Sequence, residues 1–247
     1  MTQLSSFGDN LTVAIVGASG GIGQAFCRML ASDAQVDTVY ALSRSPLKFQ
    51  DDKIQALNID IEDEASVKAA ADALTDVEFD LVLVLTGILH QGDDLQPERR
   101  LSELMPQSLH KAFAVNTIGP AMVAKHFIPK LKRRTKSVFA ALSARVGSIA
   151  DNRLGGWASY RSSKAALNQI LRTIAIEHAR SAKHSIVVAL HPGTVDTGLS
   201  KPFTGRTPPE KLFTPEQSAA YLLKVIDGLT PEDSGEFFAW DGQKIEF

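Results

Sequence analysis

The sequence has almost no cysteine, no long apolar run and no excess of charge of one sign. Cys27 is the only cysteine, so no disulfide forms within the chain and a reducing compartment is expected, with the thiol packed in the core. No apolar run approaches the roughly 18 residues that span a membrane, and the amino terminus has neither the basic nor the apolar part of a signal peptide. We therefore expect a cytoplasmic protein without a membrane partner.

Positive and negative charges are nearly balanced and mixed along the chain, with 26 Lys and Arg against 28 Asp and Glu. This balance argues against nucleic acid or an anionic membrane as the main partner. The one basic run, Lys130 to Arg134, is interpreted as the end of a helix, where cations suit the helix dipole. The six histidines show no metal-binding spacing, so we predict no metal.

Apolar β-branched runs alternate with helical patterns from one end of the chain to the other. The 247 residues, 44% of them hydrophobic, suit one α/β domain with a sizeable core. The expected strands are 11–16, 36–42, 54–59, 80–85, 137–142, 186–190 and 237–240. The first expected helix begins after Gly23, and four more cover 62–74, 107–133, 157–181 and 214–228. A bend is expected at Gly119-Pro120, within the second of these ranges. This alternation predicts one doubly wound parallel sheet of the Rossmann type, with helices on both faces and a single domain over 1–247.

A glycine cluster follows the first expected strand and reads Gly17-Ala18-Ser19-Gly20-Gly21-Ile22-Gly23. Glycines let the backbone approach a pyrophosphate closely, and the helix that follows offers free N–H groups and the positive end of its dipole. The pattern therefore predicts a dinucleotide site. The alternative is a glycine-rich turn that binds nothing.

The end of the second expected strand bears on the choice of cofactor. In dinucleotide folds, an acidic residue about 20 positions beyond the glycines binds the ribose 2′-hydroxyl. Ser43 and Arg44 stand there instead, and a serine beside a guanidinium favours a 2′-phosphate. We predict NADP (NADPH) rather than NAD. The alternative is that Arg44 is only a surface residue.

The carboxyl ends of the expected strands are where ligands bind in a doubly wound sheet. Six residues with glycine, polar or proline side chains lie directly there: Gly17, Ser43, Asp60, Gly87, Ser143 and Pro192. The connections 88–106 and 194–213 are expected to shape the substrate pocket, but their sequences carry no interpretable pattern.

Tyr160 and Lys164 stand four residues apart at the head of an amphipathic helix. Positions i and i+4 share one side of a helix, so the phenol and the ammonium are expected to be neighbours. A nearby cation favours the ionised form of a tyrosine, whose reference pKa is about 10. The pair is therefore predicted to give and take a proton, unless the two are unrelated exposed residues.

In this order and spacing, the motifs resemble the short-chain dehydrogenase/reductase family over nearly the whole chain, from Thr12 to Phe247. The glycine turn is similar to the T-G-x-x-x-G-x-G of the family, with Val16 in place of the threonine, and Tyr160 and Lys164 fit its Y-x-x-x-K. Further matches are Asp60-Ile61 with the adenine-contacting Asp-Val step, Asn116 with the helix asparagine of the proton relay, and Pro192-Gly193-Thr194-Val195-Asp196-Thr197 with P-G-x-V-x-T. Segments 142–152 and 155–167 also resemble C-factor and sniffer-type carbonyl reductases.

The resemblance implies an NADP-dependent carbonyl reductase that transfers hydride between the nicotinamide and a carbonyl or alcohol substrate. Tyr160 would protonate the alkoxide, while Lys164 would lower the pKa of Tyr160 and hold the nicotinamide ribose. Ser143 would polarise the carbonyl, and Asn116 would position Lys164 through water. The residues implied to bind the cofactor are Gly17, Ser19, Gly21, Ile22, Gly23, Ser43, Arg44, Asp60, Ile61, Gly87, Tyr160, Lys164, Pro192, Gly193, Val195 and Thr197.

Two positions depart from the family pattern. The N-N-A-G after the fourth strand reads Val84-Leu85-Thr86-Gly87, so only its glycine is kept. The catalytic serine stands three positions before a glycine in the family, and here that position is Ala144. Ser143 is our candidate for the role and Ser148 is the reserve. A site that works without a serine is the third option.

Three functions stay open at this point. An NADP-dependent reductase or dehydrogenase is the first, and an NADP-binding sensor of the same fold with little turnover is the second. The third is an isomerase or dehydratase, against which the glycine spacing and the short carboxyl-terminal part argue. The apolar stripes of helices 107–133 and 157–181 predict a homodimer or homotetramer, with Phe127 and Trp157 at the interface unless an intrachain core takes them.

Overall fold

The computed structural model describes residues 4–92, 94–206 and 208–247. Within them, a central sheet of seven strands runs in the order β3-β2-β1-β4-β5-β6-β9, and every neighbouring pair is parallel. The strands are β1 (Leu11–Val16), β2 (Val36–Ser43), β3 (Ile54–Asn58), β4 (Leu81–Val84), β5 (Ser137–Leu142), β6 (Ser185–His191) and β9 (Phe237–Ala239). This arrangement confirms the predicted α/β fold with a doubly wound sheet of the Rossmann type.

The strands form where the sequence predicts them. Most are runs of apolar residues that the helices bury, whereas each residue of the edge strand β3 is half-buried or exposed. β4 and β5 are buried along their whole length, as expected for strands covered on both faces. The predicted ends differ from the observed ends by no more than one residue. Chain order reverses between β1 and β4, so the connections that follow these two neighbours leave the sheet on opposite faces.

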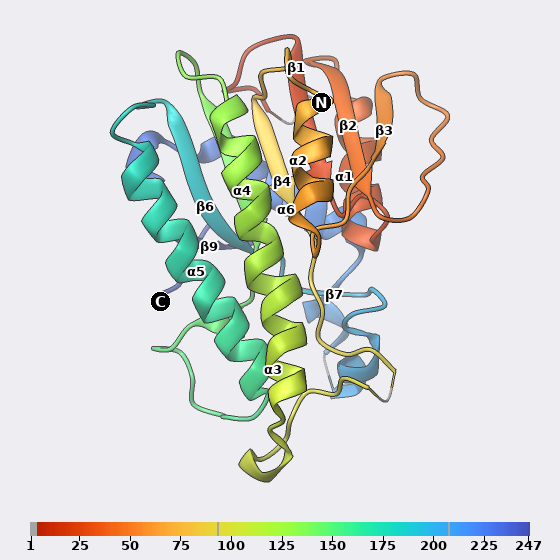
Figure 1. The fold of residues 1–247 in the computed structure, drawn as a ribbon, viewed down its shortest axis with the longest axis vertical. Helices are drawn as coiled ribbons and strands as arrows, with labels where there is room; N and C mark the ends of the chain where they lie inside the picture. The colour runs from red at the N-terminus through yellow and green to blue at the C-terminus, as the bar shows by residue number, and fades with distance from the viewer. Residues whose placement is uncertain (1–3, 93, 207) are drawn as a thin grey trace.

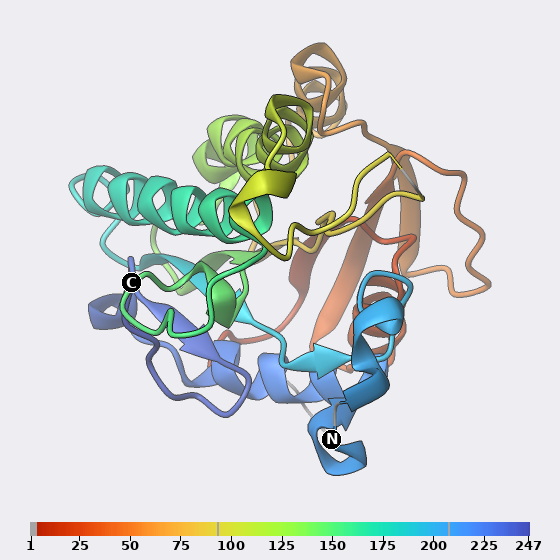
Figure 2. The same ribbon diagram turned by 90° about the horizontal axis from the view of Figure 1, so that it is seen from below.

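Helices cover both faces of the sheet, as Figures 1 and 2 show. One layer holds α2 (Glu64–Asp72), α3 (Pro106–Phe113), α4 (Gly119–Phe127) and α5 (Ala158–His178), and the other holds α1 (Gly21–Ala31) and α6 (Pro215–Gly228). Each layer buries its own apolar cluster against the sheet. Cys27 is fully buried, as predicted, and burial raises its pKa to about 12. Phe127, considered above for a subunit interface, packs in the core of this chain instead.

The helix expected over 107–133 is present but is divided. α3 passes through a π-helical turn, Ala114–Ile118, into α4, and Figure 1 shows the parts as one rod. Pro120 lies in the first turn of α4, where a missing N–H is tolerated. Gly119 packs tightly on Ile61, because a Cβ there would lie 2.8 Å from Ile61 Cδ1. Gly119 and Pro120, where a bend is predicted, thus follow directly on a π turn, a feature often found near functional sites.

Short elements that the sequence did not predict occur in the two long connections at the carboxyl edge. Segment 194–213 contains a small parallel pair of strands, β7 (Thr194–Val195) and β8 (Leu212–Phe213). The described part of segment 88–106 contains a 3₁₀ turn, Leu101–Glu103. Two-residue strands and single turns have no periodicity from which to predict them. Among the described helices, none is both long and apolar enough to cross a membrane.

Candidate active site

Two adjoining cavities lie at the carboxyl edge of the sheet, beside the point where chain order reverses. The larger has a volume of about 750 Å³ and is lined by Tyr160 among others, and the smaller has a volume of about 550 Å³. Gly20 and residues 85–87 line both, so the cavities meet over the end of β4. Figure 2 views this edge, where the connections after β4, β5 and β6 gather. The paired cavities offer an elongated site in the place where dinucleotides bind such sheets.

The turn between β1 and α1 is built for close approach of a ligand. Gly17 has a φ of 91°, in the left-handed region that favours glycine. A Cβ on Gly23 would lie 2.3 Å from the carbonyl oxygen of Gly17, so only glycine lets the turn close. α1 begins at Gly21 with no side-chain cap, and its first N–H groups are available where the two cavities meet. This geometry fits a pyrophosphate.

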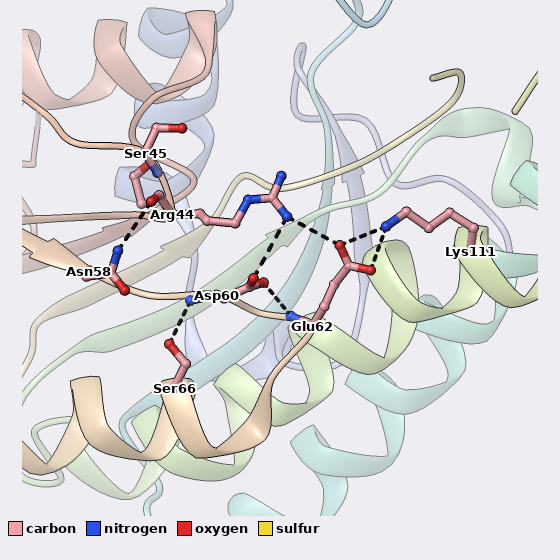
Figure 3. A network of polar contacts seen from close by, with 8 residues as sticks. Arg44, Ser45, Asn58, Asp60, Glu62, Ser66 and Lys111 are labelled. Carbon is pink, nitrogen blue, oxygen red and sulfur yellow. Dashed lines mark hydrogen bonds and ion pairs between the residues drawn. The ribbon is translucent and has the colours of Figure 1, made fainter. Parts of the chain in front are cut away.

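Charged side chains from three elements meet at the far end of the smaller cavity (Figure 3). Nη1 of Arg44 lies 3.6 Å from Glu62 Oε1 and 3.9 Å from Asp60 Oδ2. Both separations exceed hydrogen-bond length, so the guanidinium, 70% exposed, keeps its donors for another anion. Nζ of Lys111 donates to both oxygens of Glu62, at 2.7 and 2.9 Å. Lys111 is a second cation at this end, and nothing in the sequence pattern of its helix singled it out.

Ser43 and Asp60 hold the turns that shape this end of the site. The Oγ of Ser43, which is buried, accepts from the N–H of Ser45 at 3.1 Å. Oδ1 of Asp60 accepts from the N–H of Glu62 at 3.0 Å, and the Asp60 N–H donates to Ser66 Oγ at 2.9 Å (Figure 3). Both side chains therefore fix the backbone on which Arg44 and Glu62 are carried.

Tyr160 and Lys164 lie one turn apart on α5, and both line the larger cavity. Lys164 is 2% exposed, its Nζ donates to the Leu142 carbonyl oxygen at 2.8 Å, and it lies 6.0 Å from the centre of the Tyr160 ring. Burial lowers the pKa of Lys164 to about 7. Burial also raises the pKa of Tyr160, whereas the sequence argument expected the cation to lower it. Desolvation prevails over the cation because it disfavours the charged form of both side chains.

Asn116 lies in the π turn and is fully buried. Its Oδ1 accepts from the N–H of Ile88 at 2.8 Å, and its Nδ2 donates to the Ile88 carbonyl oxygen at 2.8 Å and to Ser163 Oγ at 3.1 Å. Asn116 therefore ties the start of the 88–106 connection to α5. In the part of the chain that the structure describes, no hydrogen bond joins Asn116 to Lys164, although a Cβ on Gly87 would lie within 3.6 Å of both side chains.

The positions weighed for the catalytic serine differ in what they face. Ser143 is buried and lines the larger cavity, but its Oγ donates to Asn168 Oδ1 at 2.6 Å. The Oγ of Ser148 accepts from the N–H of Asp151 at 3.0 Å, away from the cavity wall. Ala144 lines the cavity and has no hydroxyl. Among the described residues, no serine is hydrogen-bonded to the Tyr160 hydroxyl.

Glu98, which sequence reasoning missed, holds the start of the helix that carries Tyr160. Its side chain is buried, and its carboxylate accepts from the N–H of Ser159 at 3.2 Å and from the Ser159 hydroxyl. Its carbonyl oxygen accepts from the N–H of Trp157 at 2.5 Å. These bonds satisfy donors in the first turn of α5, which has no cap of its own. No signal marks Glu98 in the sequence, because it lies in an aperiodic connection 61 residues away.

Trp157, also considered above for a subunit interface, forms part of the cavity wall. Its φ is 54°, in the left-handed region that side chains disfavour, and Gly155 and Gly156 before it are also left-handed. Its ring lies edge-on to Tyr160, with centroids 6.3 Å apart, and edge-on to Phe203 at 5.3 Å. The indole therefore joins the helix of Tyr160 to the 194–213 connection.

Most of the predicted site residues line one of the two cavities. Those in the larger cavity are Gly21, Ile22, Gly23, Ser143, Tyr160, Lys164, Pro192, Gly193, Val195 and Thr197. Those in the smaller cavity are Gly17, Ser19, Ser43, Arg44, Asp60 and Ile61. Gly87 lines both, and Asn116 lies behind the wall. Within the described residues, no three His, Cys, Asp or Glu side chains gather as metal ligands would.

The sheet topology and the cavities together define a class of protein. A parallel sheet binds a dinucleotide where its chain order reverses, and here the glycine turn faces that point. A tyrosine and a lysine in the same cavity supply groups for proton transfer. This combination is that of a nucleotide-dependent oxidoreductase with a Rossmann-type fold.

Comparison with known proteins identifies the family. Residues 11–207 match the family model described as short chain dehydrogenase, and the chain belongs to this family of oxidoreductases, as predicted. The 1-hydroxy-2-glutathionyl-2-methyl-3-butene dehydrogenase of Rhodococcus sp. (strain AD45) is 33% identical over 240 residues, which cover 96% of this chain and 99% of the relative. Family members bind a nicotinamide cofactor.

Solved structures share the fold over nearly the whole chain. The NADPH-bound carbonyl reductase from chicken fatty liver superimposes with a TM-score of 0.81 at 26% identity, covering 97% of this chain and 100% of that chain. The carbonyl reductase Sniffer of D. melanogaster gives a TM-score of 0.80 at 21% identity, covering 97% and 100%. The predicted likeness to sniffer-type reductases is confirmed at the level of the fold.

Proposed function

We propose that the chain, as one domain over 1–247, is an NADP-dependent oxidoreductase that interconverts a carbonyl and an alcohol, with Tyr160 as the general acid and base. The observation that carries the proposal is the placement of Lys164. This lysine is 2% exposed in the wall of the cavity that also holds the glycine turn, and no described carboxylate lies within ion-pair distance. A buried lysine without a counter-ion destabilises a fold, so its presence points to function.

Bound NADPH supplies the hydride in reduction, and the protein supplies the proton and the placement. Tyr160 holds its proton at neutral pH, as tyrosine ordinarily does, and burial raises its pKa further. The phenol is thus protonated when the oxygen of a reduced carbonyl needs a proton. Lys164 has a pKa of about 7 and takes up a proton readily once anionic groups enter the cavity. In oxidation, the same pair accepts the proton of the alcohol.

The proposed preference for NADP rests on the charges at the end of the smaller cavity. Arg44 keeps unengaged donors, and Lys111 adds a second cation beside it. The chicken carbonyl reductase, the more similar of the two solved structures above, contains NADPH. Glu62 between the cations disfavours a phosphate, so the preference depends on Arg44 turning from Glu62 towards the 2′-phosphate.

A second candidate function is an NADP-binding sensor with little turnover. It is favoured by Ala144, which places no hydroxyl where the family pattern has its serine, and by Ser143, whose proton is engaged with Asn168. Loss of one donor to a developing oxyanion costs roughly 10²- to 10³-fold in rate. The reductase is preferred because Tyr160 and Lys164 are both kept in the cavity.

The discriminating experiment follows the loss of NADPH absorbance with a panel of aldehydes and ketones, and the gain of NADPH absorbance when NADP⁺ is supplied with the matching alcohols. Substrate-dependent NADPH consumption supports the reductase. Tight NADPH binding, seen by cofactor fluorescence, without turnover on any substrate would favour the sensor. Absence of NADPH binding would contradict both candidates.

A further inference from the structure

Part of the wall of the larger cavity comes from the connection 145–157 and the first turn of α5, which together carry three arginines. Arg145, Arg153 and Arg161 line the cavity, and Asp151 is the one carboxylate that the described wall contains. The adjoining wall is apolar and aromatic, with Leu89, Leu199 and Phe203. Positive charge beside an apolar wall suits a ligand that has an apolar body and an anionic end.

Arg161 has a structural task in this region. Its guanidinium donates to the carbonyl oxygens of Gly156 at 2.9 Å, Val146 at 3.2 Å and Gly155 at 3.2 Å. These three bonds fasten both ends of the 145–157 connection to α5. Arg161 therefore holds the segment that carries the other two arginines, and its charge is not paired with a carboxylate in the described structure.

Arg145 and Arg153 keep donors for a ligand. Nη1 of Arg145 lies 3.8 Å from Asp151 Oδ2, which is longer than a hydrogen bond, and both side chains are about half exposed. Nη1 of Arg153 donates to the Ala150 carbonyl oxygen at 2.8 Å, and none of the described hydrogen bonds engages its Nη2 or Nε. Each guanidinium has five N–H donors in a fork that matches a carboxylate.

We propose that Arg145 and Arg153 form a carboxylate-recognition site, so that the substrates are carbonyl compounds or alcohols whose apolar body carries a carboxylate away from the reacting carbon. This site would define the substrate class of the proposed oxidoreductase, and it rests on that proposed function for the carbonyl or alcohol that reacts. The arginines would bind the anionic end at the rim, while Leu199 and Phe203 contact the body and Tyr160 faces the carbonyl. Arg44, the cation proposed for the cofactor's 2′-phosphate, lines the smaller cavity, whereas Arg145 and Arg153 line the larger one.

The test compares 4-formylbenzoate with its methyl ester, which has the same aldehyde and ring but no charge. We expect kcat/KM with NADPH to be about five- to fifty-fold higher for the acid, as two rim guanidinium contacts allow. In the double variant Arg145→Gln/Arg153→Gln, kcat/KM for the acid should fall until the two aldehydes are equal, so that the preference vanishes. The matched control, Arg134→Gln/Arg180→Gln, removes two exposed arginines elsewhere and should keep the preference.

A binding measurement separates this inference from the proposed reaction. Calorimetry of the protein saturated with NADP⁺ measures binding of each aldehyde without hydride transfer. If 4-formylbenzoate binds in a way that depends on Arg145 and Arg153 but is not reduced in the NADPH assay, the carboxylate site is supported and the reductase activity is contradicted. Turnover of both aldehydes at equal kcat/KM, or acid binding that the double variant leaves unchanged, would overturn the carboxylate site.

Discussion

Lys164 combines deep burial with a charge that the proposed reaction needs. A lysine whose pKa falls from 10.5 to about 7 on folding costs stability, because the unfolded chain binds its proton more tightly. The cost is full below pH 7, shrinks as the pH rises from 7 towards 10.5, and disappears above that range. The lysine is thus kept although it lowers the stability of the folded protein, as is common for groups in active sites.

The variant Lys164→Met should therefore be more stable than the parent and inactive. Methionine fills a similar volume without a charge, so we expect a gain of about 1–3 kcal/mol at pH 6, after allowing for the bond lost to Leu142. The gain should shrink by about 2 kcal/mol between pH 6 and pH 9, since the parent's lysine is then neutral. Urea unfolding of both proteins at the two pH values measures this. A gain that grows with pH would contradict the sign of the shift.

Ser143 lies one residue before the position of the family's catalytic serine, and its side chain points towards Asn168. Its neighbour Ala144 occupies the family's serine position, and Ser143 turns towards Asn168 on α5. We now expect Ser143→Ala to lower kcat/KM by less than tenfold, because its proton is not directed at a substrate. Ser148→Ala should also change kcat/KM little, since that hydroxyl supports a turn outside the cavity. A 10²-fold loss in Ser143→Ala would restore it as the oxyanion donor.

At the level of elements, the helix α5 depends on a distant connection for its amino-terminal cap. The carboxylate of Glu98 accepts a hydrogen bond from the N–H of Ser159. Trp157, two residues before Ser159, has a left-handed backbone conformation although it is not a glycine. The position of Tyr160 is therefore set by a carboxylate from 88–106. Such a contact links the shape of the substrate pocket to the placement of the proton donor.

The variant Glu98→Ala should lower the free energy of unfolding by about 1–3 kcal/mol, since it removes a cap and leaves buried donors unpaired. It should also lower kcat more than it raises KM for NADPH, because the first turn of α5 carries Tyr160. Glu98→Gln, which keeps an acceptor, should recover part of both losses. Asp94→Ala, at an exposed carboxylate of the same connection, is the control for thermal unfolding and kinetics. Equal kcat in parent and Glu98→Ala would show that the cap is structural only.

The sequence predicts elements whose residues repeat with a period and fails for those fixed by single contacts. Apolar runs located the strands of the central sheet to within one residue, and motif spacing located Tyr160, Lys164 and the glycine turn. Glu98, Lys111 and the pair β7–β8 were not found, because each depends on a partner far along the chain. The direction of the Ser143 side chain was also beyond prediction, since it follows from how β5 ends against α5.

At the scale of the whole molecule, the layer formed by α4, the π turn before it and α5 retains exposed apolar side chains. Ile118 is 54% exposed and Ile176 is 55% exposed, although Phe127 is taken by the core. We propose that this layer pairs with the same layer of a second copy, as the apolar stripes of the sequence suggested. The face is isologous in a two-fold dimer, so each substitution would act twice.

Light scattering at micromolar concentration should give a mass of at least twice 26.7 kDa for the parent. Ile118→Asp/Ile176→Asp should shift the mass towards the monomer, because a charge buried in an apolar interface is strongly unfavourable. Leu154→Asp, an exposed leucine at the cavity rim, is the control and should leave the mass unchanged. A monomeric parent would end this proposal without affecting the active site.

Hydride transfer with Tyr160 as the proton donor is open to one decisive assay. NADPH carrying deuterium at the transferred position of the nicotinamide is incubated with an aldehyde, and the alcohol is analysed by mass spectrometry. We predict one deuterium on the carbinol carbon with the parent, and a 10²- to 10⁴-fold slower reaction with Tyr160→Phe at unchanged affinity for NADPH. Deuterated alcohol formed at the parental rate by Tyr160→Phe would contradict the assignment of Tyr160.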